Sequence, residues 1–290
     1  MLDKTISRRR MIGVGAVLAA GFAATGCGST QSTSYAQARA SAVPVADTGV
    51  RAAPVSATPA AGTTAAVAAR HAGLRPQRWG VEMAGITSTF TAAGKQMALT
   101  FDACGGPGNN DIDETLMNFL ISERIPATLF LNKRWIDANR SRAAQLAANP
   151  LFELANHGVA HKPLSVNGRE AYGIAGTGSA QEAAEEVWAN HELLTTLTGK
   201  PPRFFRAGTA HYDDVAVSIV GELGEIPVGF SINADFGATA SATAVQSAMN
   251  AAAPGAISLA HMHRPHSGTA AGMIAALPKI RATGFTFVHL

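Results

Sequence analysis

Short apolar runs alternate with helix-like stretches after residue 95, and this alternation is the feature that most limits how the chain can fold. We expect seven strands, at 97–102, 127–131, 152–157, 203–206, 228–233, 256–260 and 285–288. We expect helices between most of them, at 112–124, 140–149, 180–198, 212–223, 242–253 and 270–283, with Pro278 kinking or shortening the last. Alternating strands and helices predict an α/β fold with a parallel sheet, closed or nearly closed as a distorted (β/α) barrel of about seven strands.

Most of these strands lead into a residue that can do chemistry. The residues are Asp102, His157 with His161, Arg206, Asp235 and His261. In (β/α) barrels the C-terminal ends of the strands meet on one face, so we expect these side chains to form one site. The spacing of His157 and His161 lets both imidazoles bind one cation if the chain turns after its strand. A carboxylate and two histidines at strand ends indicate a metal hydrolase site.

Residues 1–27 have the features of an export signal rather than of a folded element. Arg8 to Arg10 resemble a twin-arginine motif, and the apolar run that follows them is too short for a comfortable transmembrane helix. The run ends in Ala-Thr-Gly-Cys, which is similar to a bacterial lipoprotein box. We therefore expect Cys27 to carry a lipid that anchors the exported protein to the membrane, in the periplasm or at the cell surface. The alternative is a soluble exported protein.

Composition and charge divide the rest of the chain in two. Residues 28–78 are rich in Ala, Ser, Thr and Pro without usable periodicity, so we expect a flexible linker. Residues 79–290 are expected to form one catalytic domain. Residues 1–78 hold nine Lys and Arg against two acids, whereas 79–290 hold fourteen against eighteen, a net charge of −4. This acidic balance argues against a nucleic-acid ligand.

The ordered strand ends resemble the polysaccharide deacetylases of carbohydrate esterase family four, which share the NodB homology domain. Thr100-Phe101-Asp102 matches the first family motif, 156–161 the second and 255–261 the fifth, while 205–208 and Asp235 match the third and fourth loosely. The resemblance covers about 96–290. It implies a NodB-like barrel that removes N-acetyl groups from a polysaccharide or cell-wall glycan with the help of a divalent metal, usually zinc.

The resemblance also implies a role for each candidate residue. Asp102 is the expected general base, and Arg206 beside it keeps the carboxylate ionised and oriented. His157 and His161 are the expected metal ligands. His261 is the expected general acid, and Asp235 favours its charged form. The same assignments follow from the needs of amide hydrolysis, which are an activated water, a stabilised oxyanion and an acid for the departing amine.

The first motif departs from the family, which commonly has a second carboxylate after the base as the third metal ligand. Here that position is Ala103, followed by Cys104 and a glycine-rich turn. The third ligand is then Asp102 itself, a water, Asp111 or Asp113, or the Cys104 thiolate. We favour Asp102 or water and interpret Cys104 as a small buried residue. Ala103→Asp is expected to tighten metal binding if the strand directs that side chain toward the histidines.

Three further features are considered as parts of a glycan site. Trp135, after the second strand, is a candidate for stacking on a sugar ring, although a core position is the alternative. His263 and His266 are interpreted as surface histidines outside the core site. The loop 163–178, with four glycines, either covers the cleft or is simply mobile.

Two other functions remain compatible with the sequence. One is a non-catalytic glycan-binding protein on the same fold, in which loss of the carboxylate at position 103 has removed metal and activity. The other is hydrolysis of a different amide or an imide on the same scaffold. Metal content and acetate release separate the first alternative from a deacetylase, and a panel of substrates separates the second.

Overall fold

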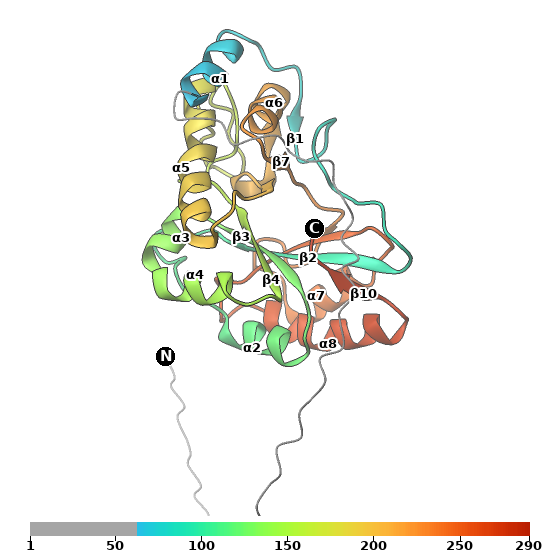
Figure 1. The fold of residues 1–290 in the computed structure, drawn as a ribbon. Coiled ribbons are helices and arrows are strands. Elements are labelled where there is room, and N and C mark those ends of the chain that lie inside the picture. The colour runs from blue at the N-terminus through green and yellow to red at the C-terminus, as the bar shows by residue number, and fades with distance from the viewer. Residues whose placement is uncertain (1–62) are drawn as a thin grey trace, which may run out of the picture. The chain divides into compact units, whose positions relative to one another are not determined.

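A curled parallel sheet organises the computed structural model, which describes residues 63–290 (Figure 1). Its hydrogen-bonded order is β7-β5-β4-β3-β2-β9-β8, and β10 pairs with residues 96–98 of β2. The strands are β2 Gln96–Ala103, β3 Ala127–Leu131, β4 Phe152–Asn156, β5 Phe204–Phe205, β7 Ile226–Pro227, β8 Ile232–Asn233, β9 Ile257–His261 and β10 Thr286–Val288. The sheet forms a half-barrel, which confirms the predicted distorted barrel of about seven parallel strands.

Helices cover the sheet and fill most of the predicted positions. They are α2 Glu114–Ser122, α3 Lys133–Ala138, α4 Arg140–Ala147, α5 Ala180–Thr198, α6 Asp214–Glu222, α7 Ala242–Met249 and α8 Thr269–Ala282. The longest, α5, begins where the Ser179 side chain accepts from the Glu182 amide, and it ends at Gly199, whose φ of 74° is left-handed. Pro278 lies inside α8, which runs on for four residues beyond it. The short helix α3 was not predicted.

The predicted linker is too long at its C-terminal end. Thr63–His71 form a helix, α1, whose Val67 and Ala68 are buried in a core shared with α5 and α6. A two-residue pair, β1 (Trp79–Gly80) with β6 (Tyr212–Asp213), joins the following segment to the domain. The alanine-rich composition that suggested a tether also suits a helix, and a tertiary partner for Val67 stabilises it.

Strand β2 runs through the centre of the sheet. Its side chains point alternately to the two faces of the sheet, and this alternation decides which of them face the site. Leu99, Phe101 and Ala103 are fully buried in the main hydrophobic core, together with apolar residues of α2, α7 and α8. Thr100 and Asp102 point to the opposite face, because successive side chains of a strand alternate. Ala103 therefore does not face the histidines, and the condition attached to the Ala103→Asp expectation is not met.

The N-terminal predictions fall largely outside the described residues. The export signal, the lipid-bearing Cys27 and the linker up to residue 62 all belong to that part of the chain. Among residues 63–290, no helix is both long enough and apolar enough to cross a membrane.

Candidate active site

A cavity of about 690 Å³ lies at the C-terminal ends of the central strands. Its wall includes Asp102 from β2, His261 from β9 and His161 from the loop after β4. The parallel register pairs Asp102 directly with His261, so the two strand ends present these residues side by side. The sheet therefore gathers at this edge the polar residues that the sequence places at strand ends.

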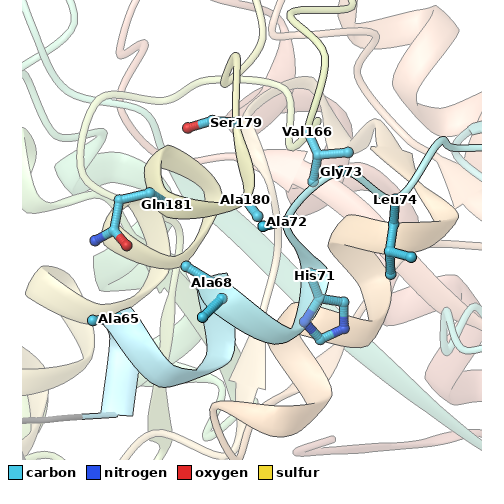
Figure 2. Close-up of a pocket in the computed structure, with 11 residues that line it drawn as sticks. Ala65, Ala68, His71, Ala72, Gly73, Leu74, Val166, Ser179, Ala180 and Gln181 are labelled. Carbon is cyan, nitrogen blue, oxygen red and sulfur yellow. The ribbon is translucent and has the colours of Figure 1, made fainter.

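A second cavity, of about 440 Å³, lies between α1 and the start of α5 and is shown in Figure 2. Small and apolar side chains form much of its lining, and His71 is the single titratable residue in it. The Nδ1 atom of that histidine bonds the Val67 carbonyl oxygen within α1 at 2.9 Å. This cavity therefore offers none of the paired acids, bases or ligands found at the strand ends.

Arg206, which follows β5, holds the carboxylate of Asp102 in place. One guanidinium nitrogen, Nη1, donates to Asp102 Oδ1 at 2.7 Å and to Thr100 Oγ1 at 2.9 Å. The other, Nη2, donates to the Gly229 carbonyl oxygen at 2.9 Å. Both partners of this ion pair are buried, so the pair is shielded from solvent screening and its geometry is fixed. The free oxygen, Asp102 Oδ2, lies 3.5 Å from His157 Nε2.

His157 is oriented for metal binding by a backbone contact. Its Nδ1 lies 2.7 Å from the carbonyl oxygen of Arg206. Because a carbonyl can only accept, Nδ1 carries the proton and Nε2 is left with a lone pair, which lies near Cys104 Sγ and Asp102 Oδ2. Burial lowers the pKa of His157 to about 3, and burial together with His157 holds the pKa of His161 well below its ordinary value. Both imidazoles are therefore neutral, as metal ligands must be.

Cys104 completes a compact group of donors with these histidines. One donor atom each from Cys104, His157 and His161 lie within 4.8 Å of one another. The Cys104 sulfur is 3.8 Å from His157 Nε2. Burial raises the pKa of the Cys104 thiol, with His261 acting in the opposite direction. The group fits a divalent metal, because imidazole and sulfur are ligands that zinc prefers and the three donor atoms lie close together.

Glu186 on α5 anchors the backbone that carries His161. Its Oε1 accepts from the amides of Val159 at 3.1 Å, Ala160 at 2.9 Å and Lys162 at 3.2 Å. His161 itself has a φ of 59°, a left-handed conformation that costs a non-glycine residue energy and needs such support. Sequence reasoning missed Glu186, because no local signal tells an inward-facing glutamate of a helix from an exposed one.

The second half of the site is the pair of His261 and Asp235. Asp235 Oδ1 lies 2.8 Å from His261 Nδ1, and its Oδ2 accepts from the His261 amide at 2.7 Å and from Thr269 Oγ1 at 2.8 Å. Burial lowers the pKa of His261, but the Asp235 charge and hydrogen bond outweigh it and raise that pKa well above the ordinary value. The His261 imidazole is therefore protonated and can act as a proton donor.

His263, interpreted from the sequence as a surface histidine, is buried and lines the cavity. Its Nδ1 lies 3.2 Å from the carbonyl oxygen of Asp102. Burial, and secondarily the charge of His261, lowers its pKa to about 4. After β9 the Met262 amide still donates to the Asp102 carbonyl oxygen, which keeps the following residue, His263, beside the end of β2.

The structure thus brings six predicted site residues into one connected set: Asp102, His157, His161, Arg206, Asp235 and His261. Trp135 is a correction. Its ring is fully buried, and its Nε1 donates to the Asp111 carbonyl at 2.9 Å, so no face is open to a sugar. Asp113 is also excluded as a ligand, because its side chain caps α2.

Comparison with known proteins agrees with this fold. Residues 91–226 match the family model described as polysaccharide deacetylase. A search of curated proteins finds no match. Among solved structures, a peptidoglycan N-acetylglucosamine deacetylase has 20% sequence identity and a TM-score of 0.58, covering 70% of this chain and 89% of that one.

Two other solved structures show the same fold with different described activities. A family 4 carbohydrate esterase pseudoenzyme from Bacillus anthracis has 18% identity and a TM-score of 0.58, over 70% of this chain and 66% of that one. A family 4 acetyl xylan esterase from Clostridium thermocellum, solved with a cobalt ion, has 19% identity and a TM-score of 0.55, over 67% and 88%.

The fold is an α/β domain with a curled parallel sheet, and two carboxylates, an arginine and several imidazoles lie at the C-terminal edge of that sheet. Over residues 91–226 the chain is similar to the polysaccharide deacetylase family.

Proposed function

We propose that this protein is a metal-dependent hydrolase that removes N-acetyl groups from an N-acetylated glycan. The observation that carries the proposal is the meeting of a fixed carboxylate, two neutral imidazoles and a protonated imidazole around one cavity. This set offers a candidate residue for each step of amide hydrolysis, which supports the proposal. The presence of a pseudoenzyme among similar structures makes direct measurement of turnover the decisive test.

The hydrogen bonds support a separate role for each residue of the site. His157 and His161 hold the divalent metal, which we propose to be zinc. When bound, it polarises the acetyl oxygen and acidifies a water. Asp102 accepts the proton of the attacking water through Oδ2, while Arg206 holds Oδ1. His261 donates its proton to the departing amine, and Asp235 stabilises the charged imidazole before that transfer.

Two exposed aromatic side chains are proposed to contact the sugar in place of Trp135. Among residues 63–290, five large apolar side chains are exposed, and three of these line the cavity: Tyr172, Ile174 and Phe236. Tyr172 is 83% exposed and Phe236 is 58% exposed. Exposed rings beside a polar cavity match the alternating apolar and polar faces of a sugar. Tyr172 belongs to the long loop 163–178, so this loop contributes to the cavity wall.

Acetate release tests the function directly. The full chain, loaded with zinc, is incubated with peptidoglycan, a chitin-like oligomer and an N-acetylated exopolysaccharide. We expect acetate release from one of them, loss of release after chelation and recovery on adding zinc. Binding to a glycan without acetate release, at full zinc occupancy, would instead support the non-catalytic alternative. Release of a different acid or amine from other amides or imides would support the second alternative.

Tyr172→Ala is expected to raise KM for the glycan about two- to tenfold, because an aromatic contact contributes roughly 0.5–1.5 kcal/mol. We expect kcat to change little, since Tyr172 touches none of the proposed proton-transfer groups. Tyr172→Phe keeps the ring and should behave like the wild type. Ile121→Ala, an exposed apolar residue of α2 that does not line the cavity, is the control. Equal KM values for all four proteins would contradict the sugar contact.

We propose further that residues 1–27 export the protein and that a lipid on Cys27 anchors it to the membrane. This placement suits an enzyme that works on cell-wall or surface glycan. Cys27→Ser removes the acceptor of the lipid and is expected to move the exported protein from the membrane fraction to the soluble fraction, because no other stable attachment is apparent in the sequence. An unchanged membrane fraction would contradict lipidation.

A further inference from the structure

Cys104 is the first residue after β2, the strand that carries the proposed base, and it lines the cavity of the site. Asp102 and Cys104 are two residues apart, so they share the face of the chain that looks toward His157, while Ala103 between them is in the core. Cys104 lines the same cavity as Asp102 and His161. A small buried packing residue would have apolar neighbours, whereas this sulfur is surrounded by ionisable groups.

The donor spacing fits one tetrahedral ion. With a Zn–S bond of about 2.3 Å and a Zn–N bond of about 2.0–2.1 Å, a tetrahedral angle separates sulfur and nitrogen by roughly 3.6 Å. The Cys104 sulfur lies 3.8 Å from His157 Nε2, so the side chains need to move only slightly to bind together. The Arg206 carbonyl already holds the His157 ring in the orientation that turns Nε2 toward that sulfur.

We propose that the Cys104 thiolate is the third protein ligand of the divalent metal, beside His157 and His161. This inference deepens the proposed function, because it concerns the metal of the same site. It gives a site with one sulfur and two nitrogen ligands and an open position for water or substrate, as catalytic zinc sites require. Ligand exchange releases the thiol proton to solvent as the metal–sulfur bond forms. Asp102, freed from ligation, remains available as the base.

A sulfur ligand changes which ions the site prefers. Thiolate favours zinc and cobalt over magnesium, calcium and manganese, which prefer oxygen ligands. The metal also covers the sulfur, so the holoprotein should react slowly with thiol-modifying reagents and the metal-free protein quickly.

Cobalt substitution tests the ligand without relying on turnover. A Co–S bond gives a charge-transfer absorption in the near ultraviolet, and we expect it in the wild-type full chain loaded with one equivalent of cobalt. Cys27→Ser is the matched control, since the chain has only these two cysteines, and it should keep the band. Cys104→Ser should lose the band and bind zinc at least about tenfold more weakly, since loss of even an outer-shell partner costs about 10- to 100-fold.

The chemical reactivity of Cys104 gives a second readout that does not depend on the folding of a Cys104 variant. In Cys27→Ser, zinc should slow alkylation of Cys104 by iodoacetamide at least tenfold. The same protection should disappear when His161→Ala is added, because the ion then has too few ligands. Circular dichroism of both proteins checks that the fold is retained.

Two results would overturn the inference: a cobalt-loaded wild type without the charge-transfer band, or a Cys104→Ser protein that keeps it. Loss of turnover in Cys104→Ser without any band in the wild type would assign the thiol to the reaction itself, beside His261. A band without acetate release would leave the ligand in place and reject the deacetylase function. Acetate release without a band would support the deacetylase function and reject Cys104 as a metal ligand.

Discussion

His157→Ala is expected to remove bound zinc and acetate release together. The variant loses the imidazole that is fixed by the Arg206 carbonyl and faces both Cys104 and Asp102. Metal contributes several kcal/mol to the transition state of such a reaction, and each 1.36 kcal/mol is tenfold, so turnover should fall about 1,000-fold or more. The measurements are zinc per chain after gel filtration and the rate of acetate release.

Two companion variants make this result specific. Asp102→Asn should retain zinc but lose turnover by about 100- to 10,000-fold, because the base is removed while the ligands remain. His289→Ala, whose imidazole bonds the Leu151 carbonyl and does not line the cavity, should change neither quantity. If His157→Ala kept wild-type zinc and turnover, the assignment of the site would be wrong.

The fold could be predicted because its signal is repeated along the chain. Each strand–helix unit is marked locally by an apolar run, a cap or a breaker, as at Ser179 and Gly199 around α5. The half-barrel then follows from the rule that alternating strands and helices form parallel sheets. Helix α1 was missed because its alanine-rich sequence also suits a linker, and its stability depends on burying Val67 against α5 and α6, a contact that no local pattern reveals.

The site was predictable to the extent that its residues stand at strand ends. Asp102, His157, Arg206 and His261 each follow or end a strand of the parallel sheet, so sheet geometry alone brings them together. Glu186 lies in the middle of a helix, where only the tertiary structure shows that it turns inward. His263 likewise reaches the cavity through the turn after β9, which the sequence does not specify.

Cys104 had a signal that was available in the sequence. Residues two apart share a face where the chain stays extended, so an extended continuation just past the strand would have matched Cys104 rather than Ala103 with Asp102. The adjacent carboxylates that are common in the family favour position 103 instead. The structure places Ala103 in the core, and the proposed ligand set with Cys104 differs in this way from the family's usual one.

Ala103→Asp provides the clearest test of that assignment. The new carboxylate would enter a fully buried core position beside Phe101 and apolar residues of α2, with no partner to compensate its charge. An uncompensated buried charge costs about 3–5 kcal/mol, and for a domain of this size 1 kcal/mol corresponds to about 2–4 °C. We therefore expect Tm to fall by roughly 6–20 °C at pH 7 and zinc affinity not to increase.

The pH dependence of Tm separates the effect of the new charge at position 103 from the effect of the shape of the new side chain. Burial raises the pKa of the new carboxyl in the folded state above its unfolded value of about 3.9, so the folded protein binds the extra proton more readily. The penalty is then largest above the folded pKa and shrinks as pH falls toward 4. Ala103→Asn has nearly the same shape without the charge, and its Tm should not share this extra pH dependence. An Ala103→Asp protein with unchanged Tm and tighter zinc binding would contradict this assignment. It would mean that position 103 faces the histidines and that a carboxylate there can bind the metal, as is common in the family.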